Sequence, residues 1–159
     1  MATSGTRTFT LYVNEVIEEA YSRIGGETIT GKESSSGRRS LNLLFKEWSN
    51  RSIQLWSVSE STQTLTSGTA NYTLNSYTID VEDAVISVTN SDNTRTDYEI
   101  ERISRDDYLK IPNKADTGRP SQYFLDKQLT PIVYLYPTPN SADSFRYKER
   151  KALEDITAA

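Results

Sequence analysis

The sequence predicts an α+β fold, in which an N-terminal αα-hairpin is followed by a small antiparallel β-sandwich or barrel-like domain. Two observations lead to this prediction. Apolar residues recur every three or four positions in the first fifty residues, which is the period of helices that bury one face. After Arg51 they fall instead in short runs separated by turn residues, as in small antiparallel β-domains.

The first helix is expected to end near Gly25-Gly26, because glycine readily takes the left-handed conformation found just past a helix end. Its apolar stripe consists of Val13, Val16, Ile17, Ala20, Tyr21 and Ile24. The polar residues 26–37 predict a loop. A second helix is then expected to start at Arg38, with an apolar stripe formed by Leu41, Leu44, Phe45 and Trp48.

Short runs with strand character follow from residue 53 onward. They are IQLWSVS, TQTLT, NYTL, AVISVT, DYEIERIS, QYFLD, PIVYLYP and FRYKER. Ser104 followed by Asp106 and Asp107 has the cap and acids of a helix start, which predicts a short helix near 104–111. We therefore expect a helical part over 1–53, a β-domain over 54–150, and a C-terminal tail over 151–159 directed toward the helical part or a partner.

Composition excludes several kinds of site. The 159-residue chain has a net charge of −4 and contains neither cysteine nor histidine. Thiol nucleophiles, disulfides, histidine acid–base catalysis and the usual zinc sites are therefore absent. The adjacent acids Glu18-Glu19 and Asp106-Asp107 point apart on a helix and make poor catalytic dyads. We expect no enzymatic activity, no cofactor and no metal.

Two further classes of partner are disfavoured by the distribution of residues. No basic block is present that would indicate a sequence-specific nucleic-acid binder. The N-terminus lacks the apolar core of a signal peptide, and no apolar run approaches membrane-spanning length. We therefore expect a soluble protein without a membrane partner.

Two charged pairs stand out. Glu99 and Glu101 would lie on one strand face, where they could form a solvated charge ladder across a sheet with Arg146, Lys148 and Arg150. Arg38 and Arg39 are expected to open the second helix, where their charges meet the positive end of the helix dipole. This arrangement indicates either a carboxylate partner on an adjacent subunit or a solvated helix start.

Residues 118–139, GRPSQYFLDKQLTPIVYLYPTP, predict a hairpin whose strands are apolar on both faces. Its prolines stand at strand starts and at a strand end, where a missing amide donor is least harmful. We favour a rigid structural hairpin over the wall of a ligand pocket. Its candidate residues are Arg119, Pro120, Tyr123, Tyr134 and Tyr136.

Three segments carry a resemblance to a known family. RRSLNLLFKEWSNRSIQLWSV, LTSGTANYTL and ISRDDYLKIPNKADTGRPSQYFLDKQLTPIVYLYPTP, in this order, resemble the head-to-tail adaptors of short-tailed bacteriophages, also called connector or tail tubular protein A. The resemblance covers roughly residues 10–155, and its specificity lies in the order and spacing of the segments. Family members usually continue past the equivalent of LEDI into further helices, whereas this chain ends at Ala159.

The resemblance implies a structural virion protein at the head–tail junction, assembled in the host cytoplasm. The helical part would pack into a homo-oligomeric ring, commonly of twelve subunits, between the portal protein and the tail nozzle. Double-stranded DNA would pass through the lumen without sequence-specific contact, and acidic residues could line that channel. Candidate subunit or portal contacts are Arg38, Arg39, Tyr21 and Trp56. The alternative is a tail-associated β-sandwich that binds host-surface glycans through exposed aromatic rings.

Overall fold

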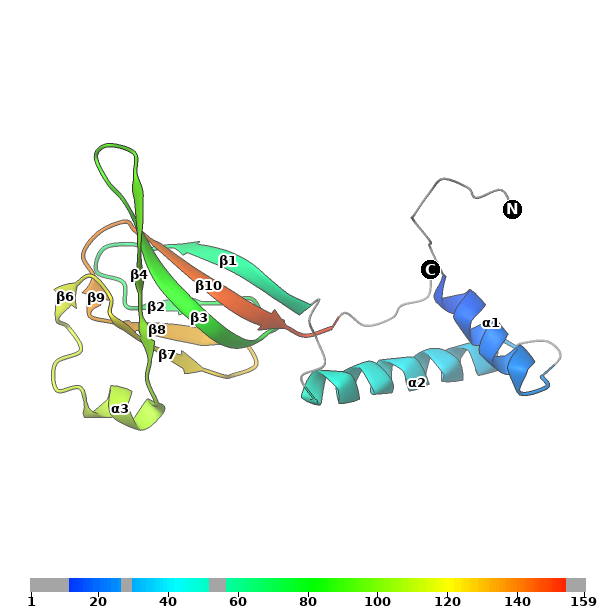
Figure 1. Cartoon of the computed structure of the whole chain (residues 1–159). Coiled ribbons are helices and arrows are strands. Elements are labelled where there is room, and N and C mark those ends of the chain that lie inside the picture. The colour runs from blue at the N-terminus through cyan, green and yellow to red at the C-terminus, as the bar shows by residue number, and fades with distance from the viewer. Residues whose placement is uncertain (1–11, 27–29, 52–56, 154–159) are drawn as a thin grey trace. The chain divides into compact units, whose positions relative to one another are not determined.

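The computed structural model describes residues 12–26, 30–51 and 57–153. The chain divides into two compact units (Figure 1). One contains helices α1 and α2, and the other contains helix α3 with strands β1 to β10. The mixed α+β class, with a helical pair followed by antiparallel sheets, is confirmed. No helix among the described residues is long and apolar enough to cross a membrane.

Helix α1 spans Val13–Arg23 and helix α2 spans Gly31–Asn50. Gly25 follows α1 with a φ of 85°, the left-handed conformation expected after the helix end. Ile24, which the apolar stripe included, lies past α1 and is 79% exposed.

The predicted loop over 26–37 is wrong for its second half, because α2 begins at Gly31. Thr30 caps this helix. Its hydroxyl accepts a hydrogen bond from the Glu33 amide at 3.4 Å, and the Glu33 carboxylate accepts one from the Thr30 amide at 2.8 Å. Arg38 and Arg39 therefore lie within α2 rather than at its start, and the predicted conflict with the helix dipole does not arise.

The two helices pack against each other at a glycine of α2, Gly37. A Cβ atom added to Gly37 would lie 2.9 Å from Cγ2 of Ile17, so glycine permits this close approach. Next to it, Nη1 of Arg38 donates a hydrogen bond to Oδ1 of Asn14 at 3.2 Å. Ile17 is the only buried side chain among the described residues of the helical pair.

The β-unit contains two four-stranded sheets and one short two-stranded sheet. The first sheet has the order β1-β10-β3-β4 and is antiparallel, with the strands β1 (Val58–Thr64), β10 (Ser144–Lys151), β3 (Thr78–Thr89) and β4 (Arg95–Glu99). The second has the order β2-β8-β7-β5, with the strands β2 (Asn71–Thr73), β8 (Ile132–Tyr136), β7 (Gln122–Asp126) and β5 (Glu101–Arg102). Strands β6 (Thr117–Gly118) and β9 (Thr138–Pro139) form the short sheet.

Several strand predictions need correction. Strands β5 and β7 pair in parallel, as do β6 and β9, so the β-unit is not wholly antiparallel. Residues 53–56 of the run IQLWSVS lie outside the described residues, and the end of this run forms one strand, β1, with the start of TQTLT. Helix α3 (Arg105–Lys110) lies where the sequence predicted a short helix, with the Ser104 hydroxyl accepting from the Asp107 amide at 3.1 Å.

One apolar core is shared by the two four-stranded sheets. The ring of Tyr123 on β7 packs edge-on against Phe145 on β10, with centroids 6.2 Å apart. The rest of the core also comes from both sheets and their connections. It consists of Leu65, Tyr72, Leu74, Val81, Ala84, Ile86, Ile100, Leu125, Val133, Leu135 and Tyr147.

The chain passes from the first sheet to the second at Ile100. The Ile100 amide donates to the Ala84 carbonyl of β3 at 3.2 Å, whereas the next amide, of Glu101, donates to Ser121 at 2.9 Å. Glu99 and Glu101 therefore belong to different sheets. The predicted ladder between these acids and β10 is wrong, because β3 lies between β10 and β4.

Asp80 holds cations from both sheets. Its carboxylate lies 3.0 Å from Nη1 of Arg102, 2.8 Å from Nζ of Lys127 and 3.5 Å from Nη2 of Arg150. Burial by itself would raise the pKa of Asp80. The hydrogen bond from Lys127 and the charges of Arg102 and Lys127 outweigh burial, so this pKa lies below its ordinary value.

Asp80→Asn is expected to lower the free energy of unfolding of the β-unit at pH 7 by about 1–2 kcal/mol, because partly exposed cations lose their shared carboxylate. The folded-state pKa lies below the unfolded value of about 3.9. The stabilisation is therefore present above about pH 4 and lost as the pH falls through the folded pKa. Urea unfolding at pH 7 and below pH 4 measures both effects.

The matched control is Glu99→Gln, since Glu99 is exposed and has no ion pair among the described residues. It should leave the urea midpoint nearly unchanged. Equal midpoints for Asp80→Asn and wild type at pH 7 would contradict the role of Asp80.

Gly37→Ala is expected to destabilise the helical pair, although alanine has the higher helix propensity. The added Cβ would lie 2.9 Å from Cγ2 of buried Ile17, and overpacking costs about 1–3 kcal/mol. Gly31→Ala is the control, because nothing lies within 4 Å of its added Cβ. Thermal unfolding followed by the helical circular dichroism signal compares the two. Helices that melt no earlier in Gly37→Ala than in wild type would argue against the contact.

Candidate functional site

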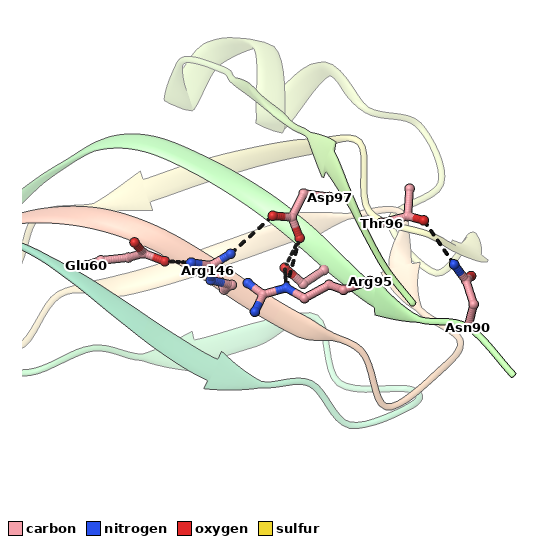
Figure 2. A network of polar contacts seen from close by, with 7 residues as sticks. Glu60, Asn90, Arg95, Thr96, Asp97 and Arg146 are labelled. Carbon is pink, nitrogen blue, oxygen red and sulfur yellow. Dashed lines mark hydrogen bonds and ion pairs between the residues drawn. The ribbon is translucent and has the colours of Figure 1, made fainter. Parts of the chain in front are cut away.

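An ion-pair network crosses the outer face of the first sheet (Figure 2). Arg146 on β10 lies between two acids: its Nη1 is 3.1 Å from Oδ2 of Asp97, and its Nη2 pairs with Glu60. Nε of Arg95 lies 3.2 Å from Oδ1 of Asp97 and 3.3 Å from the Ser87 hydroxyl. The network thus connects β1, β10, β3 and β4 across the whole sheet.

The hydrogen bond from the Ser87 hydroxyl, with a further contribution from Arg95, holds the pKa of Asp97 below its ordinary value. Lys148 on β10 pairs with Glu82 on β3 at 3.0 Å. Arg95, Arg146 and Lys148 on this face are thus each paired with an acid. An open groove of about 480 Å³ lies beside them, lined in part by Val58, Glu60 and Lys148.

The hairpin of β7 and β8 is covered on both faces. Tyr123 and Leu135 are opposite each other in the core. On the other face, Phe124 and Tyr134 stack at 5.8 Å between ring centroids. Tyr108 of α3 lies 5.6 Å from Phe124 and 5.5 Å from Tyr134 and completes a three-ring cluster.

The remaining hairpin candidates contact other parts of the β-unit. Pro120 is fully buried. The guanidinium of Arg119 lies 3.6 Å from the ring centroid of Tyr98, which is a cation–π contact. The hydroxyl of Tyr136 donates to Oδ2 of Asp116 at 3.3 Å. Each of these side chains is thus held by neighbours within the β-unit.

The candidate contact residues of the helical unit do not gather at one place. Arg38 bonds to Asn14 near the start of α1, whereas Tyr21 lies near Gly26, beyond the other end of that helix. Arg39 is exposed. Trp56 lies outside the described residues.

Sequence reasoning missed a buried carboxylate. Glu149 on β10 is 0% exposed, accepts hydrogen bonds from the hydroxyls of Ser61 and Thr78, and lies 3.3 Å from Nζ of Lys151. Burial first, and the Glu149 charge second, raise the pKa of Tyr147 to about 12. The two-residue period that puts Phe145 and Tyr147 in the core also puts Glu149 there, and this signal was available in the sequence.

No group of acids among the described residues is arranged to hold a metal ion. The candidate site residues in the described part of the chain therefore form ion pairs and packed aromatic contacts. A comparison with family models matches the SU10 adaptor protein family over residues 11–159. The chain belongs to the SU10 adaptor family. No curated protein matches the sequence.

Membership confirms the resemblance to phage head-to-tail adaptors that the sequence predicted. The chain is accordingly a structural bacteriophage protein and a virion component, and its family implies association with other virion proteins. A structural adaptor family also indicates a non-enzymatic role.

Arg146→Met is expected to lower the melting temperature of the protein at low salt, because Glu60 and Asp97 lose their shared cation. The loss of melting temperature should be smaller in 1 M NaCl, because salt at that concentration screens charges beyond about 3 Å. Lys148→Met is the control, since it removes a cation with one acidic partner, and it should have a smaller effect. A loss independent of salt, or equal in both variants, would contradict the network.

Proposed function

We propose that this SU10 adaptor forms a ring at the head–tail junction that joins the portal protein to the tail nozzle. Double-stranded DNA passes through the lumen of this ring without sequence-specific contact. The family resemblance supports a ring of twelve copies assembled in the host cytoplasm. In this proposal residues 1–53 form the ring and residues 54–150 form the β-domain, whose two sheets make a small sandwich around their shared core.

The observation that supports the ring is the apolar surface left uncovered on the helical unit. Ile17 is the only buried side chain among its described residues, whereas Leu43 is 66% exposed and Tyr12 is 62% exposed. Covering apolar surface contributes about 25 cal/mol per Å², before ordering costs of several kcal/mol are subtracted. Neighbouring copies and the portal supply that cover, and Arg38, Arg39, Tyr21 and Trp56 are the proposed contacts.

The β-domain supports a different role in the same assembly. Its two sheets share one apolar core, and Arg146 and Lys148 on its outer face are each paired with acids. It is therefore proposed to act as a stiff spacer, with residues 151–159 as a C-terminal tail directed toward the helical part or a partner. Host-glycan binding is not favoured, because the rings of Tyr108, Phe124 and Tyr134 pack on one another.

The purified adaptor is expected to be a monomer or loose oligomer alone and a ring when mixed with the portal of its phage. Sizing by light scattering with and without portal measures this. An unchanged mass on mixing would contradict the proposed function.

Leu43→Ser provides a variant of this experiment, because its side chain is exposed and removing it should weaken ring formation without unfolding the chain. Leu129→Ser is the control: Leu129 is 93% exposed in the turn between β7 and β8 of the β-unit. It should leave ring formation unchanged. Equal effects of the two substitutions on ring formation would contradict a specific role for the helical unit in the ring.

A further inference from the structure

The side of α2 opposite its contact with α1 bears a line of cations. Lys32, Arg39 and Lys46 are spaced by seven residues, so they lie on nearly one side of the helix, about 10 Å apart along its axis. Leu43 lies on the same side, four residues from Arg39, and is 66% exposed. Gly37, where Ile17 packs, lies roughly 160° around the helix from Arg39. We call Lys32, Arg39, Leu43 and Lys46 the α2 ridge.

A groove of about 430 Å³ lies on the β-unit where the chain passes between the sheets. Its apolar floor includes half-buried Val85 beside Ala84 and Ile100, which are each 5% exposed. The passage at Ile100 opens this floor, because β4 ends and β5 continues in the other sheet. The groove is thus a direct consequence of the strand order.

Exposed carboxylates surround the apolar floor. They are Glu82, Asp83, Glu99 and Glu101. Glu82 pairs with Lys148, and Arg102, the cation that lines the groove, pairs with Asp80. Asp83, Glu99 and Glu101 have no ion pair among the described residues. We call these acids and the apolar floor the β-groove.

The ridge and the groove are complementary in charge and in apolar character. We propose that the α2 ridge of one copy docks in the β-groove of the next copy. Leu43 then covers the apolar floor, and Arg39 and Lys46 face the carboxylates around it. This inference rests on the proposed ring and names the two surfaces that close it.

A second copy of the chain fits the β-groove, because each chain carries both surfaces and their charges are opposite in sign. A contact between two different patches of the same chain repeats from copy to copy and closes into a ring when the rotation permits. Opposite charges on the two patches also disfavour the wrong pairings, ridge to ridge and groove to groove.

Disulfide trapping tests the contact, because the chain contains no cysteine. Leu43→Cys and Glu99→Cys proteins, each with one cysteine, are mixed in equal amounts, assembled with portal and oxidised. A covalent dimer containing one of each variant is expected. The control pairs Leu43→Cys with Leu129→Cys, which is exposed but lies in the turn between β7 and β8. Equal yields in the two mixtures would overturn the proposal.

Charge exchange provides a second test. Arg39→Glu makes the ridge more acidic while leaving the groove acidic, and Glu99→Arg combined with Glu101→Arg makes both surfaces basic. Each variant alone is expected to require about tenfold more protein for ring formation. A mixture should recover, because the acid introduced at position 39 can then face the cations introduced at positions 99 and 101.

The outcomes separate the docking surface from the proposed function. If wild-type chain forms rings on the portal and both charge variants do so equally well, the ridge-to-groove contact is wrong and the ring stands. If the ridge instead serves the portal or DNA, Arg39→Glu will weaken assembly and the mixture will not recover, which also overturns the contact. If wild-type chain forms no ring, both proposals fall. Thermal melts of each variant verify that it is folded.

Discussion

The packing of Tyr123 against Phe145 joins the two four-stranded sheets, and the rest of the β-unit depends on it. Because the two sheets share a common core, the chain can leave one and enter the other at Ile100. That passage positions the β-groove. The same proximity lets Asp80 of the first sheet reach Arg102 and Lys127, which come from the other sheet and the turn after it. The shared apolar core thus positions both the ion pairs of Asp80 and the β-groove proposed for docking.

Stability is distributed unevenly between the two units. The β-unit buries a core shared by its sheets, whereas the described part of the helical pair buries Ile17 alone. Helix α1 has 11 residues, and isolated helices shorter than about 12–15 residues are marginal in water. Helix α1 therefore depends on its contacts with α2, of which the described ones are the packing of Ile17 at Gly37 and the hydrogen bond from Arg38 to Asn14. For an adaptor this inequality is useful, because the unit with uncovered surface gains most from neighbours.

Local sequence signals were sufficient to predict an element where a single capping residue starts a helix. Ser104 and the acids after it predicted α3 because a helix cap acts within three residues. The corresponding signal at Thr30 and Glu33 was present but outweighed by the polar composition of residues 31–37, so the start of α2 was missed. The separation of Glu99 from Glu101 could not be predicted, because a two-residue period assumes that the strand stays in one sheet. The partners of Arg146 followed from strand order, which is a long-range property.

The central claim is that the β-unit is held by its own core while the helical unit awaits neighbours. Native-state hydrogen exchange on the isolated chain tests it directly, because amide protection reports the free energy of local opening. The account predicts the slowest exchange in β3, β7, β8 and β10, near the global unfolding limit, and much faster exchange throughout α1 and α2. Helices protected as strongly as these strands in the isolated chain would contradict it.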